Sequence, residues 1–73
     1  MLIRDAFATV LRLERQKQNL SQNKLAEMAG ISRMYLWRLE QGRQSPTLDV
    51  LIALCNALQI DAGKFVGEIT KQL

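Results

Sequence analysis

The sequence predicts an all-α fold of five helices, for three reasons. Apolar residues recur at intervals of three and four through almost the whole chain, which is the spacing of a helix that buries one face. No stretch alternates apolar and polar residues as a half-buried strand would. The 73 residues, 48% of them apolar, suffice for one small core, so residues 1–73 are expected to form a single domain with short connections.

The first helix is expected over about residues 3–18. Its buried side holds Ile3, Phe7, Val10 and Leu11. The next position on that side is occupied by Glu14, whereas Leu13 falls off the stripe. Two outcomes stay open: Glu14 finds a cationic partner at the edge of the core, or the helix bends and Leu13 turns inward. Asn19 is expected to end the helix in the left-handed conformation that Asn tolerates.

Two short helices follow, at about residues 22–29 and 33–41, and the pair is predicted to be a helix-turn-helix. Ser21 and Ser32 are suited to cap them, because each hydroxyl can accept a hydrogen bond from the first turn. Gly30 lies at the turn, where a positive φ costs glycine little. Seven positions carry the small, apolar and glycine residues that the motif requires: Leu25, Ala26, Ala29, Gly30, Ile31, Leu36 and Leu39. A generic helical hairpin is the alternative.

The fourth helix is expected over about residues 48–58, with Thr47 as its cap. Its core side is predicted to hold Leu48, Leu51, Ile52, Cys55 and Leu58. Cys55 is the only cysteine, so no disulfide is expected, and we interpret it as a small buried hydrophobe rather than a reactive thiol. The fifth helix is expected from about residue 62, after the capping Asp61. Its apolar stripe consists of Phe65, Val66, Ile69 and Leu73.

Charge is unevenly distributed along the chain. Residues 1–44 hold eight cations against four anions, whereas residues 45–73 hold two cations against three anions. The first turns of the two motif helices contain no acid, although a helix N-terminus favours one; they begin Gln22-Asn23-Lys24 and Arg33. Phosphate groups would suit two such helix starts, so the pattern predicts a polyanionic partner. Ordinary surface charge is the alternative.

The second motif helix also has an unusual outward face. Arg33, Met34, Trp37, Arg38 and Gln41 fall within one arc, opposite the inward-facing leucines. An arginine can pair with guanine in the DNA major groove, and Met34 and Trp37 can contact thymine methyl groups or sugar. The alternatives are a protein contact or partial burial for Trp37, and solvated or helix-paired charges for the two arginines.

Several classes of function are excluded by composition. The chain has no histidine and one cysteine, so it cannot supply a Cys/His metal site or a His-based catalytic site by itself. No apolar run approaches the roughly 18 residues of a membrane span, and the opening MLIRDAFATV is too short and too charged for a signal peptide. We therefore expect a cytoplasmic protein that is not an enzyme, with no metal, cofactor or membrane partner.

Residues 20–58, LSQNKLAEMAGISRMYLWRLEQGRQSPTLDVLIALCNAL, resemble the phage Cro/C1-type (XRE-like) helix-turn-helix family, and the similarity extends from about Phe7 to Val66. The resemblance implies a five-helix, lambda-repressor-like domain that binds double-stranded DNA as a dimer. It places Arg33, Met34, Trp37 and Arg38 at base-reading positions. It places Gln22, Ser32, Arg43 and Gln44 near DNA phosphates, with Gln22 also able to reach a base. Asn23 and Lys24 replace acids that are usual in the family, and they are expected near phosphate because they leave the first turn without an acid. It matches Arg15 and Glu40 to a structural ion pair.

The sequence departs from the family pattern at several positions: Glu14 replaces a usual Leu, Asn19 a usual Gly, and Trp37 a usual small residue. The short stand-alone members that it resembles include restriction-modification controllers, small prophage repressors and antitoxin-type regulators. The expected function is a homodimeric transcription regulator that represses or autoregulates at a roughly palindromic operator. The last helix, residues 61–73, would supply the dimer interface through Phe65, Ile69 and Leu73, with a frayed tail as the alternative. Contact with RNA polymerase is a further expectation, and an antitoxin-type module with a toxin partner is the rival interpretation.

Overall fold

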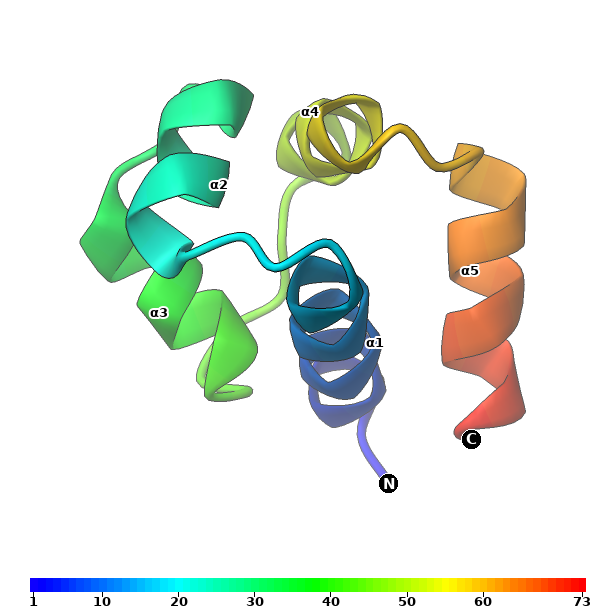
Figure 1. The fold of residues 1–73 in the computed structure, drawn as a ribbon. Coiled ribbons are helices and arrows are strands. Elements are labelled where there is room, and N and C mark those ends of the chain that lie inside the picture. The colour runs from blue at the N-terminus through cyan, green and yellow to red at the C-terminus, as the bar shows by residue number, and fades with distance from the viewer.

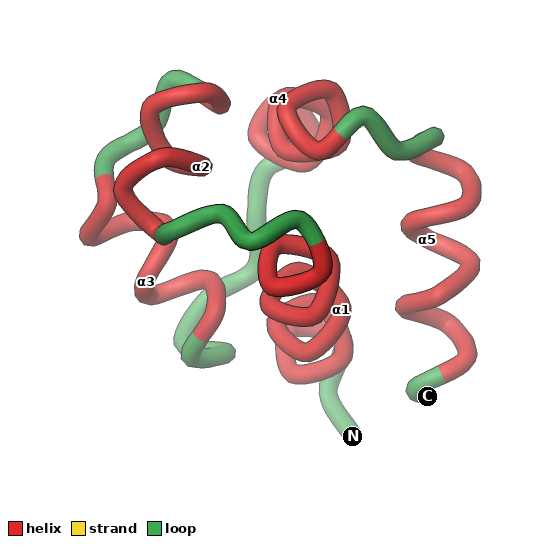
Figure 2. The backbone as a smooth tube through the Cα atoms, in the orientation of Figure 1, coloured by secondary structure: helices red, strands yellow, loops and turns green.

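A computed structural model describes all residues 1–73 and contains five α-helices and no strand, as predicted (Figures 1 and 2). The helices are α1 (Ile3–Lys17), α2 (Gln22–Ala29), α3 (Arg33–Glu40), α4 (Leu48–Leu58) and α5 (Ala62–Lys71). Helix α1 lies in the centre, with α2 and α3 on one side, α5 on the other, and α4 across the top (Figure 1). The predicted first and third helices each extend one residue beyond the C-terminal end of the observed helix.

Four of the helices begin with a side-chain cap at the predicted residue. The side-chain oxygens of Ser21, Ser32, Thr47 and Asp61 each accept a hydrogen bond from the backbone N–H three residues later, at 2.9–3.2 Å. Gly30 adopts a positive φ of 73°, and Asn19 one of 57°, so both turns have the left-handed residue that the sequence predicts. The caps therefore set where these four helices start along the chain.

Side chains from all five helices meet in one core. Its largest fully buried members are Phe7, Leu11, Leu25, Leu36, Leu39, Leu54, Leu58 and Phe65. The rings of Phe7 and Phe65 meet edge to face, with centroids 5.9 Å apart, so that α5 is packed onto α1. The predicted core positions Val10 and Leu11 are buried as well.

Other core predictions are wrong, most clearly in α4. Leu48 is 71% exposed and Ile52 is also exposed, whereas Leu54, which was not assigned to the core, is fully buried. Apolar residues surround most of α4, so the pattern alone does not say which side faces inward, and packing against α2 and α5 decides it. Ile3 is likewise exposed, at the start of α1 where less of the core lies beneath it. Met28, near the end of α2, is exposed as well.

The conflict between Glu14 and Leu13 resolves in favour of the first alternative. The Lys17 ammonium donates to the Glu14 carboxylate at 3.1 Å, and this carboxylate side chain is mostly covered. Leu13 stays outward and exposed. A lysine one turn away thus accommodates the acid at the edge of the core.

No single helix is long and apolar enough to cross a membrane. Helices α4 and α5 meet that test only when they are taken together, and they are bent by 106° at their junction. Both helices contribute fully buried side chains to the core.

Candidate nucleic-acid interface

The two helices of the motif are joined to α1 by a buried ion pair. Glu40, at the end of α3, is almost completely buried. Arg15 of α1 donates to both of its carboxylate oxygens, from Nε at 2.6 Å and from Nη2 at 2.9 Å. Gln22, at the start of α2, donates to the same carboxylate at 3.1 Å. The pairing that the resemblance implies is therefore present, and it connects three helices.

Arg15 also closes the loop between α1 and α2. Its Nη1 donates to the carbonyl oxygen of Leu20 at 2.9 Å. The hydrogen bond that Arg15 donates to Glu40, together with the negative charge of Glu40, raises the pKa of the Arg15 guanidinium against the opposing effect of burial. Gln22, which was expected at DNA phosphate or base, has its amide nitrogen directed inward to this network. Gln22 therefore supports the Arg15–Glu40 ion pair, in addition to any contact with DNA.

The starts of α2 and α3 leave several donors accessible. Neither first turn contains an acid, whereas α1 and α4 have Asp5 and Asp49 there and α5 is capped by Asp61. Asn23 is exposed. The Lys24 ammonium lies 3.7 Å from the Glu27 carboxylate, in a solvent-exposed pair that contributes little to stability. Because a serine cap uses only its oxygen as an acceptor, the hydroxyl proton of Ser32 remains free to donate.

The outward face of α3 has a shallow hollow of about 130 Å³, lined by Arg33, Met34 and Trp37. Arg33 and Met34 are exposed, and Trp37 is half-buried. The side chain of Arg33 makes no hydrogen bond or ion pair within the chain. Three of the four residues expected to read bases therefore lie together around one depression.

The loop after α3 is held against the same face by two contacts that the sequence did not predict. The Arg38 Nε donates to the side-chain oxygen of Gln44 at 3.2 Å. The guanidinium of Arg43 lies 5.0 Å from the centre of the Trp37 ring, in a cation–π contact. Trp37 is thus partly covered by a cation of the following loop. Both contacts cross the end of α3, so helical spacing rules contain no signal for them.

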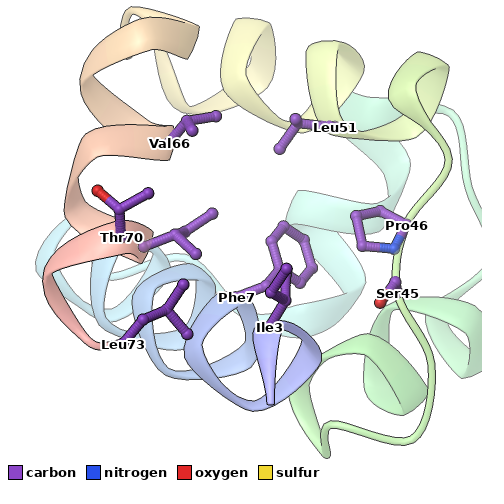
Figure 3. Close-up of a pocket in the computed structure, with 9 residues that line it drawn as sticks. Ile3, Phe7, Ser45, Pro46, Leu51, Val66, Thr70 and Leu73 are labelled. Atoms are coloured by element: carbon purple, nitrogen blue, oxygen red, sulfur yellow. The ribbon is translucent and has the colours of Figure 1, made fainter. Parts of the chain in front are cut away.

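A second feature lies on the other side of α1, where an apolar groove of about 280 Å³ opens between α1, α4, α5 and the loop before α4. Figure 3 shows Ile3, Phe7, Pro46, Leu51, Val66 and Leu73 around this space. The groove is lined by Ile3, Phe7, Ser45, Pro46, Leu51, Val66, Ile69, Thr70 and Leu73.

The three residues expected at a dimer interface differ in exposure. Phe65 is 0% exposed and contacts Phe7, so it faces the core of its own chain, whereas Ile69 is 7% exposed, packs in the core and also lines the groove. Of the three expected residues only Leu73 is exposed, at 58%. The apolar stripe of α5 packs mainly into the core of its own chain. The exposed apolar side chains beside it are Val66 and Ile3.

Comparison with known proteins agrees with this geometry. A helix-turn-helix family model (HTH_3) matches residues 11–65, which is most of the chain and includes all of α2, α3 and α4. The chain belongs to the helix-turn-helix family. Its XRE-type character is also what the resemblance of residues 20–58 indicated.

Relatives of this helix-turn-helix chain include a control protein and a transcriptional regulator. The control protein C.SmaI of Serratia marcescens is 36% identical over 66 residues, which cover 90% of this chain and 79% of that protein. The transcriptional regulator ClgR of Mycobacterium tuberculosis is 36% identical over 70 residues, and the match spans 86% of this chain but only 62% of ClgR. Among solved structures, the clp gene regulator ClgR of Corynebacterium glutamicum superposes with a TM-score of 0.93 at 29% identity, covering 100% of this chain and 95% of that one.

Proposed function

We propose that this chain is a non-enzymatic transcription regulator that recognises a specific sequence in double-stranded DNA. The observation that carries the proposal is the outward face of α3, where Arg33, Met34 and Trp37 lie together and Arg38 is oriented beside them. Helix α3 would enter the major groove, which is wide enough for an α-helix and displays a different pattern for each base pair. The relatives named as transcriptional regulators support this assignment.

The phosphate contacts would come from the two acid-free helix starts and from the loop after α3. Asn23, Lys24 and Ser32 are exposed there, and Arg43 and Gln44 are held beside α3 by their contacts with Trp37 and Arg38. Backbone N–H groups at a helix N-terminus add partial positive charge toward a phosphate. These groups would position the protein, while the face of α3 selects the sequence.

We also infer that the apolar groove is covered by a second copy of the chain. Ile3, Val66 and Leu73 expose apolar surface around it, on the side of α1 that is opposite α3. A twofold dimer would present two recognition helices to a roughly palindromic operator, with half-sites about 34 Å apart. Occupation of a promoter would then repress transcription, including that of the protein's own gene, in the cytoplasm.

The decisive experiment selects DNA sites in vitro with the purified chain and then measures affinity for the selected site against salt. If α3 docks on DNA, affinity falls steeply as salt rises, because phosphate contacts release counterions. Arg33→Ala should weaken binding by about 1–3 kcal/mol and relax one base position. Lys64→Ala, which removes one charge from an exposed position of α5, is the matched control and should change affinity little.

Two results would count against the proposal. If Arg33→Ala binds the selected site as tightly as the wild type, Arg33 does not read a base. Specific binding that appears only when a second protein is present would favour the rival, an interaction module of the antitoxin type whose groove holds another protein.

The dimer is tested separately by sedimentation. Leu73→Asp places a charge in the groove and should shift the chain to monomer and weaken binding to the full site. Gln72→Asp adds the same charge at the neighbouring exposed position, which does not line the groove, and should leave the dimer intact. Equal effects of the two variants would exclude the groove as the dimer interface.

A further inference from the structure

We propose that the hollow on α3 and the side chain of Arg33 read two adjacent base pairs as a unit. The hollow takes the 5-methyl group of a thymine, and Arg33 pairs with a guanine on the neighbouring base pair. This inference rests on the proposed function and deepens it, because it states which base step each half-site should contain and which side chains select it.

The first step concerns the chemistry of the hollow. Two of its three lining side chains, Met34 and Trp37, are apolar, and Met34 is 53% exposed on a face whose other members are polar. The thymine methyl is the apolar group that base pairs present in the major groove, and apolar side chains recognise it by contact. The volume of about 130 Å³ is well above the roughly 10–15 Å³ that a site needs to hold one water, so a methyl group and the ring edge that carries it have room.

The second step concerns the rigidity of the hollow. The Trp37 ring forms one wall, and Arg43 holds that ring through its cation–π contact at 5.0 Å. A wall that is already positioned loses less conformational freedom when DNA arrives, which favours a contact as small as one methyl group. Met34, with its flexible unbranched side chain, can adjust the other wall to the base.

The third step concerns the guanine. Arg38 and Arg43 are each engaged by a neighbour, whereas the Arg33 side chain makes no hydrogen bond, ion pair or cation–π contact within the chain. A free guanidinium can donate two hydrogen bonds to guanine O6 and N7. At ~1.5 Å per residue, the midpoint between Met34 and Trp37 lies about 4 Å along the helix axis from Arg33. If α3 follows the major groove, this separation is close to the ~3.4 Å between stacked base pairs, and we therefore place the two contacts on neighbouring pairs.

The test begins with the site selected in vitro and measures affinity by fluorescence anisotropy at constant salt. Each thymine is replaced in turn by deoxyuridine, which differs only by the missing methyl group. At one thymine in each half-site, the replacement should lower the affinity of the protein about fourfold. This factor corresponds to the free energy of burying one carbon group. Replacement of the adjacent guanine by 7-deazaguanine, which lacks the N7 acceptor, should weaken binding by wild type and not by Arg33→Ala.

Protein variants separate the hollow from general loss of contact. Met34→Ala should bind the thymine site less tightly and should no longer distinguish thymine from deoxyuridine at that position. Met28→Ala is the matched control, since Met28 is 46% exposed on α2 and lies outside the hollow; it should keep the full difference. Circular dichroism should show all variants folded, because both methionines are exposed.

The inference is overturned if no deoxyuridine changes affinity by more than about 1.5-fold, or if Met34→Ala keeps the full penalty for deoxyuridine. Either result leaves the proposed regulator intact, because a sequence-specific site would still have been selected. Failure to select any site would overturn the proposed function together with this inference.

Discussion

Replacement of Glu40 by alanine should strongly destabilise the fold. The carboxylate is buried and accepts hydrogen bonds from Arg15 and Gln22, so its removal leaves a largely covered guanidinium without a counter-charge. Breaking a buried pair in this way costs about 3–5 kcal/mol. We take the lower value, about 3 kcal/mol, because Arg15 keeps its bond to the Leu20 carbonyl and its side chain is 13% exposed. The total free energy of unfolding of a domain of this size is only about 4–11 kcal/mol.

Thermal unfolding followed by circular dichroism would measure this loss. At about 4–8 °C per kcal/mol for a small domain, Glu40→Ala should lower Tm by at least about 12 °C. The loss should persist at high salt, because a buried pair is screened little. Glu27→Ala is the control: it breaks an exposed pair with Lys24 and should cost less than about 0.5 kcal/mol.

The reasoning would be refuted if Glu40→Ala unfolded within about 3 °C of Glu27→Ala. A double variant, Arg15→Met with Glu40→Leu, distinguishes the stranded charge from lost packing. It removes both charges and should recover much of the lost stability, because two apolar side chains of similar size leave no unpaired ion. If the double variant is no more stable than Glu40→Ala, lost packing rather than the unpaired guanidinium explains the effect.

Three further outcomes are expected from urea unfolding. Gly67→Ala should stabilise the fold by about 0.5–1 kcal/mol, because Gly67 lies inside α5 and an added Cβ meets nothing within 4 Å. Gly30→Ala has the same free space but a positive φ of 73°, so it should destabilise by about 1 kcal/mol. Burial, together with the charge of Asp61, raises the pKa of the Cys55 thiol. The unfolded thiol therefore ionises first as pH rises above about 8.5, and stability should fall there more steeply in wild type than in Cys55→Ala.

The helices and their starts were predictable because a cap is a local event. A serine or aspartate accepts a hydrogen bond from its own first turn, and this requires no knowledge of the rest of the fold. The buried face of α4 was not predictable in the same way. Leu48 and Leu54 are equally apolar, and only contact with neighbouring helices decides which of them is covered.

The same limit applies to the apolar face of α5. A stripe that includes Phe65 and Ile69 shows that one face is buried, but it does not show whether the covering surface belongs to the same chain or to another. Here α1 covers it, through the contact of Phe7 with Phe65. The contact of Arg43 with Trp37 escaped prediction for a related reason, since it depends on how the loop after α3 folds back.

The arginines of this chain differ in the charge of their partners, and that difference bears on function. Arg15 is largely covered and faces a buried carboxylate, which compensates its charge where little solvent reaches. Arg38 and Arg43, on the proposed DNA face, are held by the neutral side chains of Gln44 and Trp37. A neutral partner orients a guanidinium without cancelling its charge, whereas an acidic partner would have to be displaced before a phosphate or base could bind. The outer face is therefore ordered in advance and still fully cationic, as recognition of a polyanion requires.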